Sequence, residues 1–281
     1  MLQRVAIRKL IIFRNKKKPE SKNLASAILP ILEKGFACTV TDNTDEAAAL
    51  ISAGADAAIC LGGDGTILSV ASAAAESDTP ILGINLGHLG YMSELEANEI
   101  SMLENLCDGN YGIEKRFMLS AKLIHGDGTA EEYGALNEIL VCRGAVSKMI
   151  RLALRCNGTD VAAYRADGLI VSTPTGSTAY ALSAGGPIID PALSLISVCP
   201  ICPHTFAGAR PLVFSPDSEL EITVSSLYNG DIYLTADGKA SRSVNYDDVI
   251  TVTGSERSVR FIKLKSNAFY QTLYKKFKAG V

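Results

Sequence analysis

The chain has 281 residues, of which 47% are hydrophobic, enough for a sizeable buried core in one large or two ordinary domains. Its formal net charge of −3, from 27 basic and 30 acidic residues, gives no general reason to expect nucleic acid or an anionic membrane as a partner. Apolar residues do not run uninterrupted for the roughly 18 positions that a membrane-spanning helix needs. An anionic ligand would therefore have to be held locally.

The N-terminal segment contains an apolar run that charged residues interrupt. Arg4, Arg8 and Lys9 break up the run, and no small-residue cleavage site follows it. We therefore interpret residues 5–13 as the first strand of a cytoplasmic protein.

Helix and strand patterns alternate from there to residue 87. Ser21 can cap a helix that continues to Gly35 with Pro30 inside it. The further expected elements are a strand over 36–40, a capped helix over 44–54, a strand over 56–60, a helix over 66–76 and a strand over 79–87. Such alternation is typical of a parallel, doubly wound sheet, so we expect an α/β domain over residues 1–116.

The pattern changes from about residue 117, where short segments rich in β-branched and aromatic residues are separated by turn signals. The expected strands lie within 118–128, 137–144, 149–158, 219–226, 231–238, 248–255 and 259–265. We expect a mostly antiparallel, sandwich-like β domain over 117–265. The last segment, 266–281, has helical spacing and is expected to pack back onto the first domain.

A glycine cluster surrounds one acid, Asp64, directly after the third expected strand. In an open parallel sheet, ligands bind beyond the carboxyl ends of the strands. Glycines tolerate positive φ and let phosphate oxygens approach backbone N–H groups, and the expected helix points its positive end at the same place. The predicted phosphate-binding loop consists of Gly62, Gly63, Gly65 and Thr66.

The acid in this loop needs a chemical reason, because a carboxylate repels phosphate. It is useful if it accepts a proton from a hydroxyl that attacks phosphorus, or holds a magnesium ion, or both. A simple Gly-Asp-Gly turn is the alternative, and the cluster alone does not decide between them. The spacing is not GxGxxG and GxxxxGK[ST] does not occur, so neither the dinucleotide fingerprint nor a P-loop is present.

Two polar residues, Asn137 and Glu138, stand just before a run of β-forming residues. An amide can bind an adenine edge or a ribose hydroxyl, and a carboxylate can accept two ribose hydroxyls. A solvated turn at the start of a strand is the alternative, so the pair alone decides nothing.

The stretch 164–187, YRADGLIVSTPTGSTAYALSAGGP, is the most informative part of the chain. The hydroxyl residues in its core are Ser172, Thr173, Thr175, Ser177, Thr178, Tyr180 and Ser183. Hydroxyls and free backbone donors at that density suit a ligand rich in hydroxyl and phosphate oxygens. Asp167, two residues after Arg165, could lie beside a cationic ring or a ribose. A serine- and threonine-rich loop without a ligand is the alternative.

The seven cysteines are an odd number and do not suggest a secreted disulfide framework. Cys199 and Cys202 have CxxC spacing with His204 nearby, which permits a zinc or redox interpretation. Because no second CxxC pair completes four ligands, we interpret them as small residues in a structured loop.

These motifs, in this order, resemble the NAD kinase family of bacterial type. The matching motifs are GGDGT, the NE of ALNEILV and the almost continuous stretch 164–187, and the blocks 83–91 and 201–213 are also similar. Together they cover about residues 57–215. GGDGT alone is shared with lipid kinases and resembles phosphofructokinases.

The resemblance implies transfer of the γ-phosphate of ATP to the 2′-hydroxyl of the adenosine ribose of NAD, which gives NADP. It also implies a divalent metal, Mg²⁺, with no residue assigned as a direct ligand, and a homotetramer or homodimer. Asp64 becomes the proton acceptor for the 2′-hydroxyl, and Gly65 contacts the substrate.

The remaining NAD contacts are implied by motif in the same way. Asn137 and Glu138 would hold the ribose and adenine region, and Arg165 and Asp167 would line the nicotinamide end. The residues around the adenosine portion would be Thr175, Thr178, Ala179, Tyr180, Ala181, Leu182 and Ser183.

Basic residues at three places have open roles. Lys148 lies where the family often has a basic residue that contacts substrate, and Lys239 lies where bacterial members often have glutamine. Lys16–Lys18 follow a first strand that matches the family loosely, and a solvated basic loop is the alternative to contact with ATP phosphates.

Two rival functions remain open at this point. A lipid or sugar kinase with the same glycine cluster would not need the hydroxyl-rich loop and would not phosphorylate NAD. A non-catalytic NADP-binding sensor would bind dinucleotide without consuming ATP, and it has no use for an acid opposed to phosphate. The sequence leaves open whether NADH is accepted, whether polyphosphate replaces ATP, and whether NADP feeds back.

Overall fold

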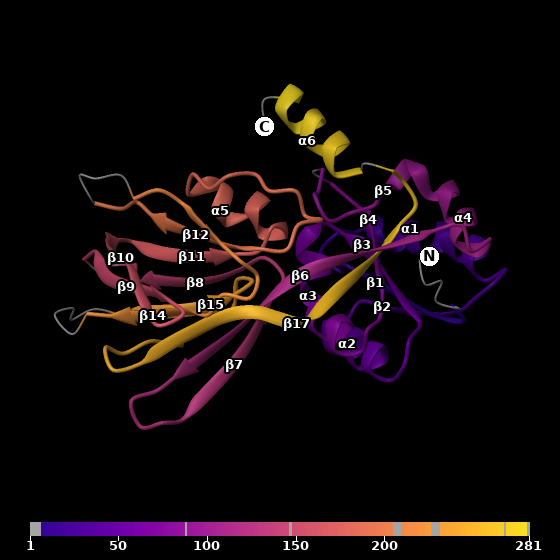
Figure 1. Cartoon of the computed structure of the whole chain (residues 1–281). Coiled ribbons are helices and arrows are strands. Elements are labelled where there is room, and N and C mark those ends of the chain that lie inside the picture. The colour runs from indigo at the N-terminus through magenta and orange to yellow at the C-terminus, as the bar shows by residue number, and fades with distance from the viewer. Residues whose placement is uncertain are drawn as a thin grey trace. The chain divides into compact units, whose positions relative to one another are not determined.

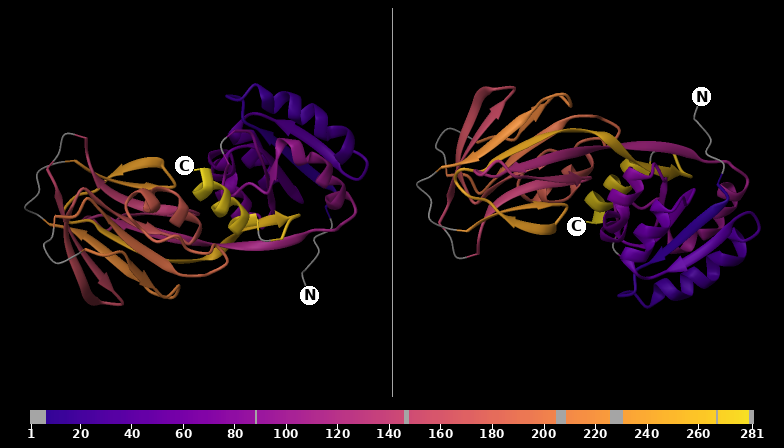
Figure 2. Two further views of the ribbon diagram at one scale, coloured as in Figure 1. Left: turned by 90° about the horizontal axis from the view of Figure 1, so that it is seen from above. Right: turned by 90° about the horizontal axis from the view of Figure 1, so that it is seen from below.

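The computed structural model describes residues 7–87, 89–145, 148–204, 209–225, 231–266 and 268–279 (Figure 1). The chain divides into two compact units, Met1–Arg116 with Arg257–Val281, and Phe117–Glu256. Two strands, β6 (Gly112–Ile124) and β17 (Val249–Lys263), continue from one unit into the other (Figure 2). Each unit is described by itself below.

The first unit contains a parallel sheet in the order β2-β1-β3-β4. Its strands are β1 (Lys9–Arg14), β2 (Ala37–Thr41), β3 (Ala57–Gly62), β4 (Ile81–Asn85) and the short β5 (Leu95–Glu96) on β4. Every residue of β3 and β4 is buried, which explains why both read as continuous apolar runs rather than as alternating patterns.

Six helical segments belong to this unit among the described residues. They are α1 (Glu20–Leu32), α2 (Thr44–Ser52), α3 (Asp64–Glu76), the 3₁₀ helix η1 (Ala97–Met102), α4 (Leu103–Cys107) and α6 (Ala268–Ala279). Helix α1 packs against α4, and α2 packs against α3. The strand order 2-1-3-4 places the topological switch point between β1 and β3, where ligands of doubly wound sheets bind.

The start of α1 differs from the prediction. The helix begins at Glu20 after Pro19, whose fixed φ suits a helix start. Ser21 therefore lies inside the helix, and its hydroxyl donates to the carbonyl of Asn15 at 2.8 Å instead of capping. Helix α2 is capped, as expected, by the side chain of Asn43.

The second unit contains two antiparallel sheets that enclose one apolar core. The strands not yet named are β7 (Ala130–Ala135), β8 (Glu138–Arg143), β9 (Ile150–Cys156), β10 (Thr159–Ala166), β11 (Gly168–Ser172), β12 (Ile196–Ile201), β13 (Leu212–Phe214), β14 (Leu220–Val224), β15 (Ile232–Ala236) and β16 (Lys239–Ser243). One sheet has the order β13-β12-β11-β8-β15-β16, and the other contains β10-β9-β14-β17 with β6 and β7. The expected α/β and mostly antiparallel β parts are thus confirmed.

Three features of these strands differ from the prediction. The segments 248–255 and 259–265 belong to one strand, β17, and β11 occupies part of the stretch 164–187, where no strand was expected. Cys199 lies in β12 and not in a loop. Strand β12 tolerates Pro200 because β13 pairs only with Ile196–Val198, so position 200 needs no donor on that side.

Within the described part of the chain, no helix is both long enough and apolar enough to cross a membrane.

Candidate active site

Asp64 is the first residue of α3, and Gly63 precedes the helix as its N-cap residue. The helix was expected from Thr66 and begins two residues earlier, because the glycines on both sides of Asp64 are more typical of a turn than of a helix. In the first turn, the partial positive charge of the helix N-terminus favours a carboxylate. The acid is therefore compatible with the same helix end that attracts phosphate.

The glycines of the cluster provide space rather than unusual backbone angles. Gly62, Gly63 and Gly65 do not have positive φ, so that expectation was wrong. A Cβ on Gly62 would lie 2.1 Å from Thr66 Oγ1, which excludes a side chain between strand and helix. A Cβ on Gly63 or Gly65 would meet nothing within 4 Å, so the surface beside Asp64 is open to a ligand.

Two backbone N–H groups, those of Tyr91 at the end of the 83–91 block and of Met92 next to it, bind the Asp64 carboxylate. Oδ2 accepts the N–H of Tyr91 at 2.9 Å, and Oδ1 accepts the N–H of Met92 at 3.1 Å. A Cβ on Gly90 would lie 2.3 Å from Oδ1, so this close approach requires glycine. A carboxylate has about four lone-pair sites, so these two bonds orient Asp64 and leave sites for a reacting hydroxyl.

Helix α6 contacts the same loop through Tyr91. The Phe269 and Tyr91 ring centroids lie 6.0 Å apart, and Lys276 Nζ lies 4.1 Å from the Tyr91 ring centroid. Residues seven apart share one face of a helix, so one face of α6 covers the ring. Burial raises the pKa of Tyr91.

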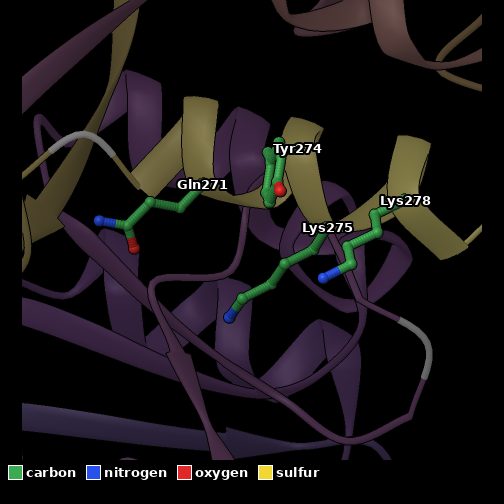
Figure 3. A pocket seen from close by; sticks show the side chains of 4 residues that line it. All are labelled: Gln271, Tyr274, Lys275 and Lys278. Atoms are coloured by element: carbon green, nitrogen blue, oxygen red, sulfur yellow. The ribbon is translucent and has the colours of Figure 1, made fainter.

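A pocket of about 510 Å³ lies along α6, lined by Gln271, Tyr274, Lys275 and Lys278 (Figure 3). None of these residues belongs to the motifs that the sequence analysis singled out. This pocket is therefore not the candidate active site.

A smaller pocket of about 180 Å³ lies at the switch point between β1 and β3. It is lined by Phe13, Arg14, Asn15, Lys16, Lys17, Asp42, Thr44, Gly65, Thr66 and Ser69. Arg14 forms an ion pair with Asp42, and Asn15 donates to Thr66 Oγ1 at 3.1 Å. The exposed residues Lys16 and Lys17 thus share a pocket with the glycine cluster, as an anion-binding site requires.

Lys18 differs from Lys16 and Lys17 in its contacts. Its ammonium group donates to the carbonyl of Leu86, and the residue lines a second hollow of about 810 Å³. Lys17 lines both hollows, whereas Lys16 lines only the smaller one and Lys18 only the larger one.

In the second unit, residues around Thr173 fix the turn that carries Asn137 and Glu138. Thr173 Oγ1 donates to the carbonyl of Leu136 at 2.6 Å, and its N–H donates to the carbonyl of Asn137 at 2.9 Å. A Cβ on Gly176 would lie 2.1 Å from the Asn137 carbonyl oxygen. The start of β8 and the loop after β11 therefore pack backbone against backbone.

Two buried hydrogen-bond acceptors on this turn are unsatisfied in the described part of the chain. Asn137 Oδ1 and Glu138 Oε2 have no hydrogen-bond partner among the described residues. The Tyr180 N–H also donates to the Glu138 carboxylate, but burial, with a smaller effect of Asp237, raises the pKa of Glu138 to about 7. Buried acceptors are almost always satisfied, so a ligand with O–H or N–H donors fits here.

Several hydroxyls of the 172–183 segment shape the loop itself. Ser172, Ser177 and Thr178 donate to the carbonyls of Thr173, Pro174 and Thr175 at 2.9, 2.6 and 3.1 Å. Ser177 and Thr178 lie in the 3₁₀ helix η2 (Thr175–Thr178), and Ser172 is the last residue of β11. Helix α5 (Tyr180–Ser183) follows η2.

Helix α5 divides its residues between core and surface. Tyr180, Leu182 and Ser183 are exposed, whereas Ala181 packs with Ile170 and Cys199. Thr175 is buried, and Thr178 and Ala179 are half-buried. The surface that this segment offers to a ligand therefore comes from its exposed residues and its backbone.

The residues expected at the nicotinamide end differ in their contacts and exposure. Asp167 accepts two bonds from Arg143, at 2.6 and 3.3 Å, and these lower the pKa of Asp167. Arg165 is exposed on β10, and Lys148 is exposed. The sequence analysis missed Arg143, because only the pairing of β8 with β11 brings it to Asp167.

The described residues contain no group of three or more His, Cys, Asp or Glu side chains that could hold a metal ion. Cys199 is buried, Cys202 is exposed, and both are free thiols. Mg²⁺ is usually bound by one or two carboxylates together with substrate phosphates. The single carboxylate of Asp64 at the glycine cluster fits a metal ion that is bound mainly by a nucleotide.

Comparisons with known families and solved structures show what this chain is similar to. The ATP-NAD kinase N-terminal domain matches residues 8–111, and the ATP-NAD kinase C-terminal domain matches residues 136–264. The NAD kinase of Caldanaerobacter subterraneus subsp. tengcongensis is 45% identical over 219 residues, which are 78% of this chain and 77% of that protein. The NAD kinase of Geotalea daltonii is 38% identical over 261 residues, 92% and 90% of the two chains.

Two solved structures are similar in fold. Yeast NADH kinase complexed with NADH matches with a TM-score of 0.84 at 23% sequence identity. The match covers 97% of this chain and 88% of the yeast chain. An NAD kinase from Archaeoglobus fulgidus in complex with ATP matches with a TM-score of 0.76 at 29% sequence identity. The match covers 97% of this chain and 99% of the Archaeoglobus chain. The resemblance inferred from the motifs is confirmed, and the chain belongs to the ATP-NAD kinase family of phosphotransferases.

Proposed function

We propose that this chain transfers the γ-phosphate of ATP to the 2′-hydroxyl of the adenosine ribose of NAD, which gives NADP and ADP. The observation that carries the proposal is the environment of Asp64. Its carboxylate is oriented by two backbone N–H groups at the N-terminus of α3, beside two glycines with open space. A bound phosphate and an oriented proton acceptor at one place are what phosphoryl transfer to an alcohol requires.

In the first unit, the ATP phosphates would bind the pocket at the switch point. Lys16 and Lys17 supply positive charge there, and the α3 N-terminus supplies backbone donors near Gly65. The ribose oxygen forms a bond to the γ-phosphorus while the bond to the β-phosphate oxygen breaks, and Asp64 takes the hydroxyl proton. A divalent metal, Mg²⁺, would arrive with ATP and neutralise phosphate charge, with Asp64 as the candidate carboxylate.

In the second unit, NAD would bind at the Asn137–Glu138 turn. The two unsatisfied acceptors, Asn137 Oδ1 and Glu138 Oε2, suit neighbouring hydroxyl groups of a ribose. Tyr180 and Ser183 are exposed on the next helix and would contact the adenosine portion. Asp167 and Arg165 remain our candidates for the nicotinamide end, with Arg143 as the partner that orients Asp167.

One assay separates this function from its rivals. The purified protein is incubated with ATP, Mg²⁺ and NAD, and NADP is measured with an NADP-specific dehydrogenase. A lipid or sugar kinase would consume ATP only with diacylglycerol or a sugar, and a sensor would bind NADP with no ATP consumption. Parallel reactions with NADH and with polyphosphate define the acceptor and the donor.

We also propose a homotetramer or homodimer located in the cytoplasm, with NAD and ATP as small-molecule partners and no nucleic acid. The family membership supports the oligomer, and the net charge of −3 argues against a polyanion partner. Sedimentation analysis of the purified chain measures the subunit number.

A further inference from the structure

The turn between β15 and β16 is not used by the proposed reaction, although it lies against the Asn137–Glu138 turn. Asp237 and Gly238 have φ of 50° and 67°, as in the tight hairpin turns whose two central residues are left-handed. The N–H of Asp237 donates to the carbonyl of Glu138 at 3.0 Å. The two turns are therefore joined by backbone as well as by side chain.

The Asp237 carboxylate accepts three successive backbone N–H groups. Oδ2 accepts from Leu136 at 2.8 Å, and Oδ1 accepts from Asn137 at 2.7 Å and from Glu138 at 3.1 Å. A carboxylate offers acceptors on both oxygens, whereas an amide would point its NH₂ group at one of these donors. Thr173 holds the carbonyl side of the same peptides.

We propose that Asp237 is a positioning residue that fixes the Asn137 and Glu138 side chains in the geometry that binds the dinucleotide. The inference rests on the proposed function, since it assigns a role toward the substrate of that reaction. With Asp237 on the N–H side and Thr173 on the carbonyl side, the peptide planes from 136 to 138 are held from both sides. The Cα–Cβ directions of Asn137 and Glu138 are then fixed, and their two unsatisfied acceptors are pre-arranged before the ligand arrives.

The charge on Asp237 indicates that this residue positions the Asn137–Glu138 turn and does not only stabilise the fold. Burial raises the pKa of Asp237 and lowers the pKa of Lys239, and Asp237 also raises the pKa of Glu138. Placing a second half-buried acid beside Glu138 costs free energy that a neutral turn residue would avoid. Lys239, the first residue of β16, offsets part of the Asp237 charge.

The test compares Asp237→Asn with Asp248→Asn in the full-length enzyme. Asp248 is the control, because it likewise accepts backbone N–H groups, from Asn245 at 2.8 Å and Gly126 at 3.3 Å. It is more buried than Asp237 (2% exposed) and also pairs with His125. Steady-state kinetics give kcat and KM for each substrate, calorimetry gives NAD binding without ATP, and thermal melting gives stability.

For Asp237→Asn we expect KM and Kd for NAD to rise roughly tenfold, because one N–H loses its acceptor and faces an NH₂ group. KM for ATP should stay unchanged. Asp248→Asn should lower the melting temperature and leave KM for NAD as in the wild type. If the two variants show the same KM for NAD at comparable melting temperatures, Asp237 is only a structural residue and the inference is wrong.

The variant Asn137→Ala distinguishes a failure of the proposed dinucleotide site from a failure of the role assigned to Asp237. If it leaves NAD binding intact, the proposed dinucleotide site is wrong and the role of Asp237 falls with it. If Asn137→Ala weakens NAD binding and Asp237→Asn does not, only the role of Asp237 is refuted. Should Asp237→Asn fold poorly, Asp237→Glu keeps the charge and displaces the oxygens by one methylene, and the same selective rise in KM for NAD is expected.

Discussion

Replacing Gly176 with alanine tests the close packing that holds the proposed NAD-binding turn. The added Cβ would lie 2.1 Å from the carbonyl oxygen of Asn137, 2.5 Å from its carbonyl carbon and 2.7 Å from its Cα. All three are backbone atoms, which cannot rotate away. Because Cβ contacts below about 3 Å do not occur, the Asn137 backbone must move by about 1 Å.

The magnitude follows from two costs. Overpacking of this kind costs about 1–3 kcal/mol. Strain in the 2.9 Å bond from the Thr173 N–H to the Asn137 carbonyl adds about 1 kcal/mol. For a unit of this size we expect the melting temperature to fall by roughly 5–15 °C. We expect KM for NAD to rise at least tenfold, because the side chains of Asn137 and Glu138 are displaced.

The assays are thermal melting and steady-state kinetics, with Gly134→Ala as the control. A Cβ on Gly134 would meet only Met118 Cε, at 3.8 Å, which is an ordinary contact. The control should match the wild type in melting temperature and in KM for NAD. Wild-type behaviour of Gly176→Ala in both measurements would show that the loop and the turn are not packed as described.

Two further predictions concern the pH dependence of binding and the role of α6. Burial raises the pKa of Glu138 to about 7, and ribose hydroxyls bind the carboxylate better than the acid. NAD affinity measured by calorimetry should therefore fall as the pH drops below about 7, by at most about tenfold per unit, and Glu138→Gln should remove this dependence; a pH-independent affinity in the wild type contradicts the reasoning. Phe269→Ala removes a ring that packs on Tyr91, whose N–H orients Asp64, so kcat should fall by up to roughly tenfold with a smaller change in KM for NAD. Phe269→Tyr keeps the ring and should retain kcat, and equal loss in both variants would exclude the ring contact as the cause.

Local sequence patterns predicted the elements whose signals lie within the element itself. The buried strands β3 and β4 and the alternating strands β9 and β14 were found from their apolar patterns. The first turn of α3 was missed because Gly63 and Gly65 carry no side-chain pattern. Strand β12 was missed because Pro200 argues against a strand until its one-sided pairing is known.

Contacts between residues far apart in the sequence account for what was missed in the candidate site. The amides of Tyr91 and Met92 reach Asp64 across 27 and 28 positions, and Asp237 reaches Asn137 across 100. No spacing rule marks such pairs, because the fold creates them. The motifs identified which residues carry the chemistry, and the structure adds the residues that orient them.

The most direct test of the account is the turnover of Asp64→Asn, measured as NADP formed from saturating ATP and NAD. The variant keeps the size of the side chain and removes its ability to accept a proton. We expect kcat to fall by about 10² to 10⁴ while the fold and most NAD binding are retained. Turnover above about a tenth of the wild type would contradict the assignment of Asp64 as the base.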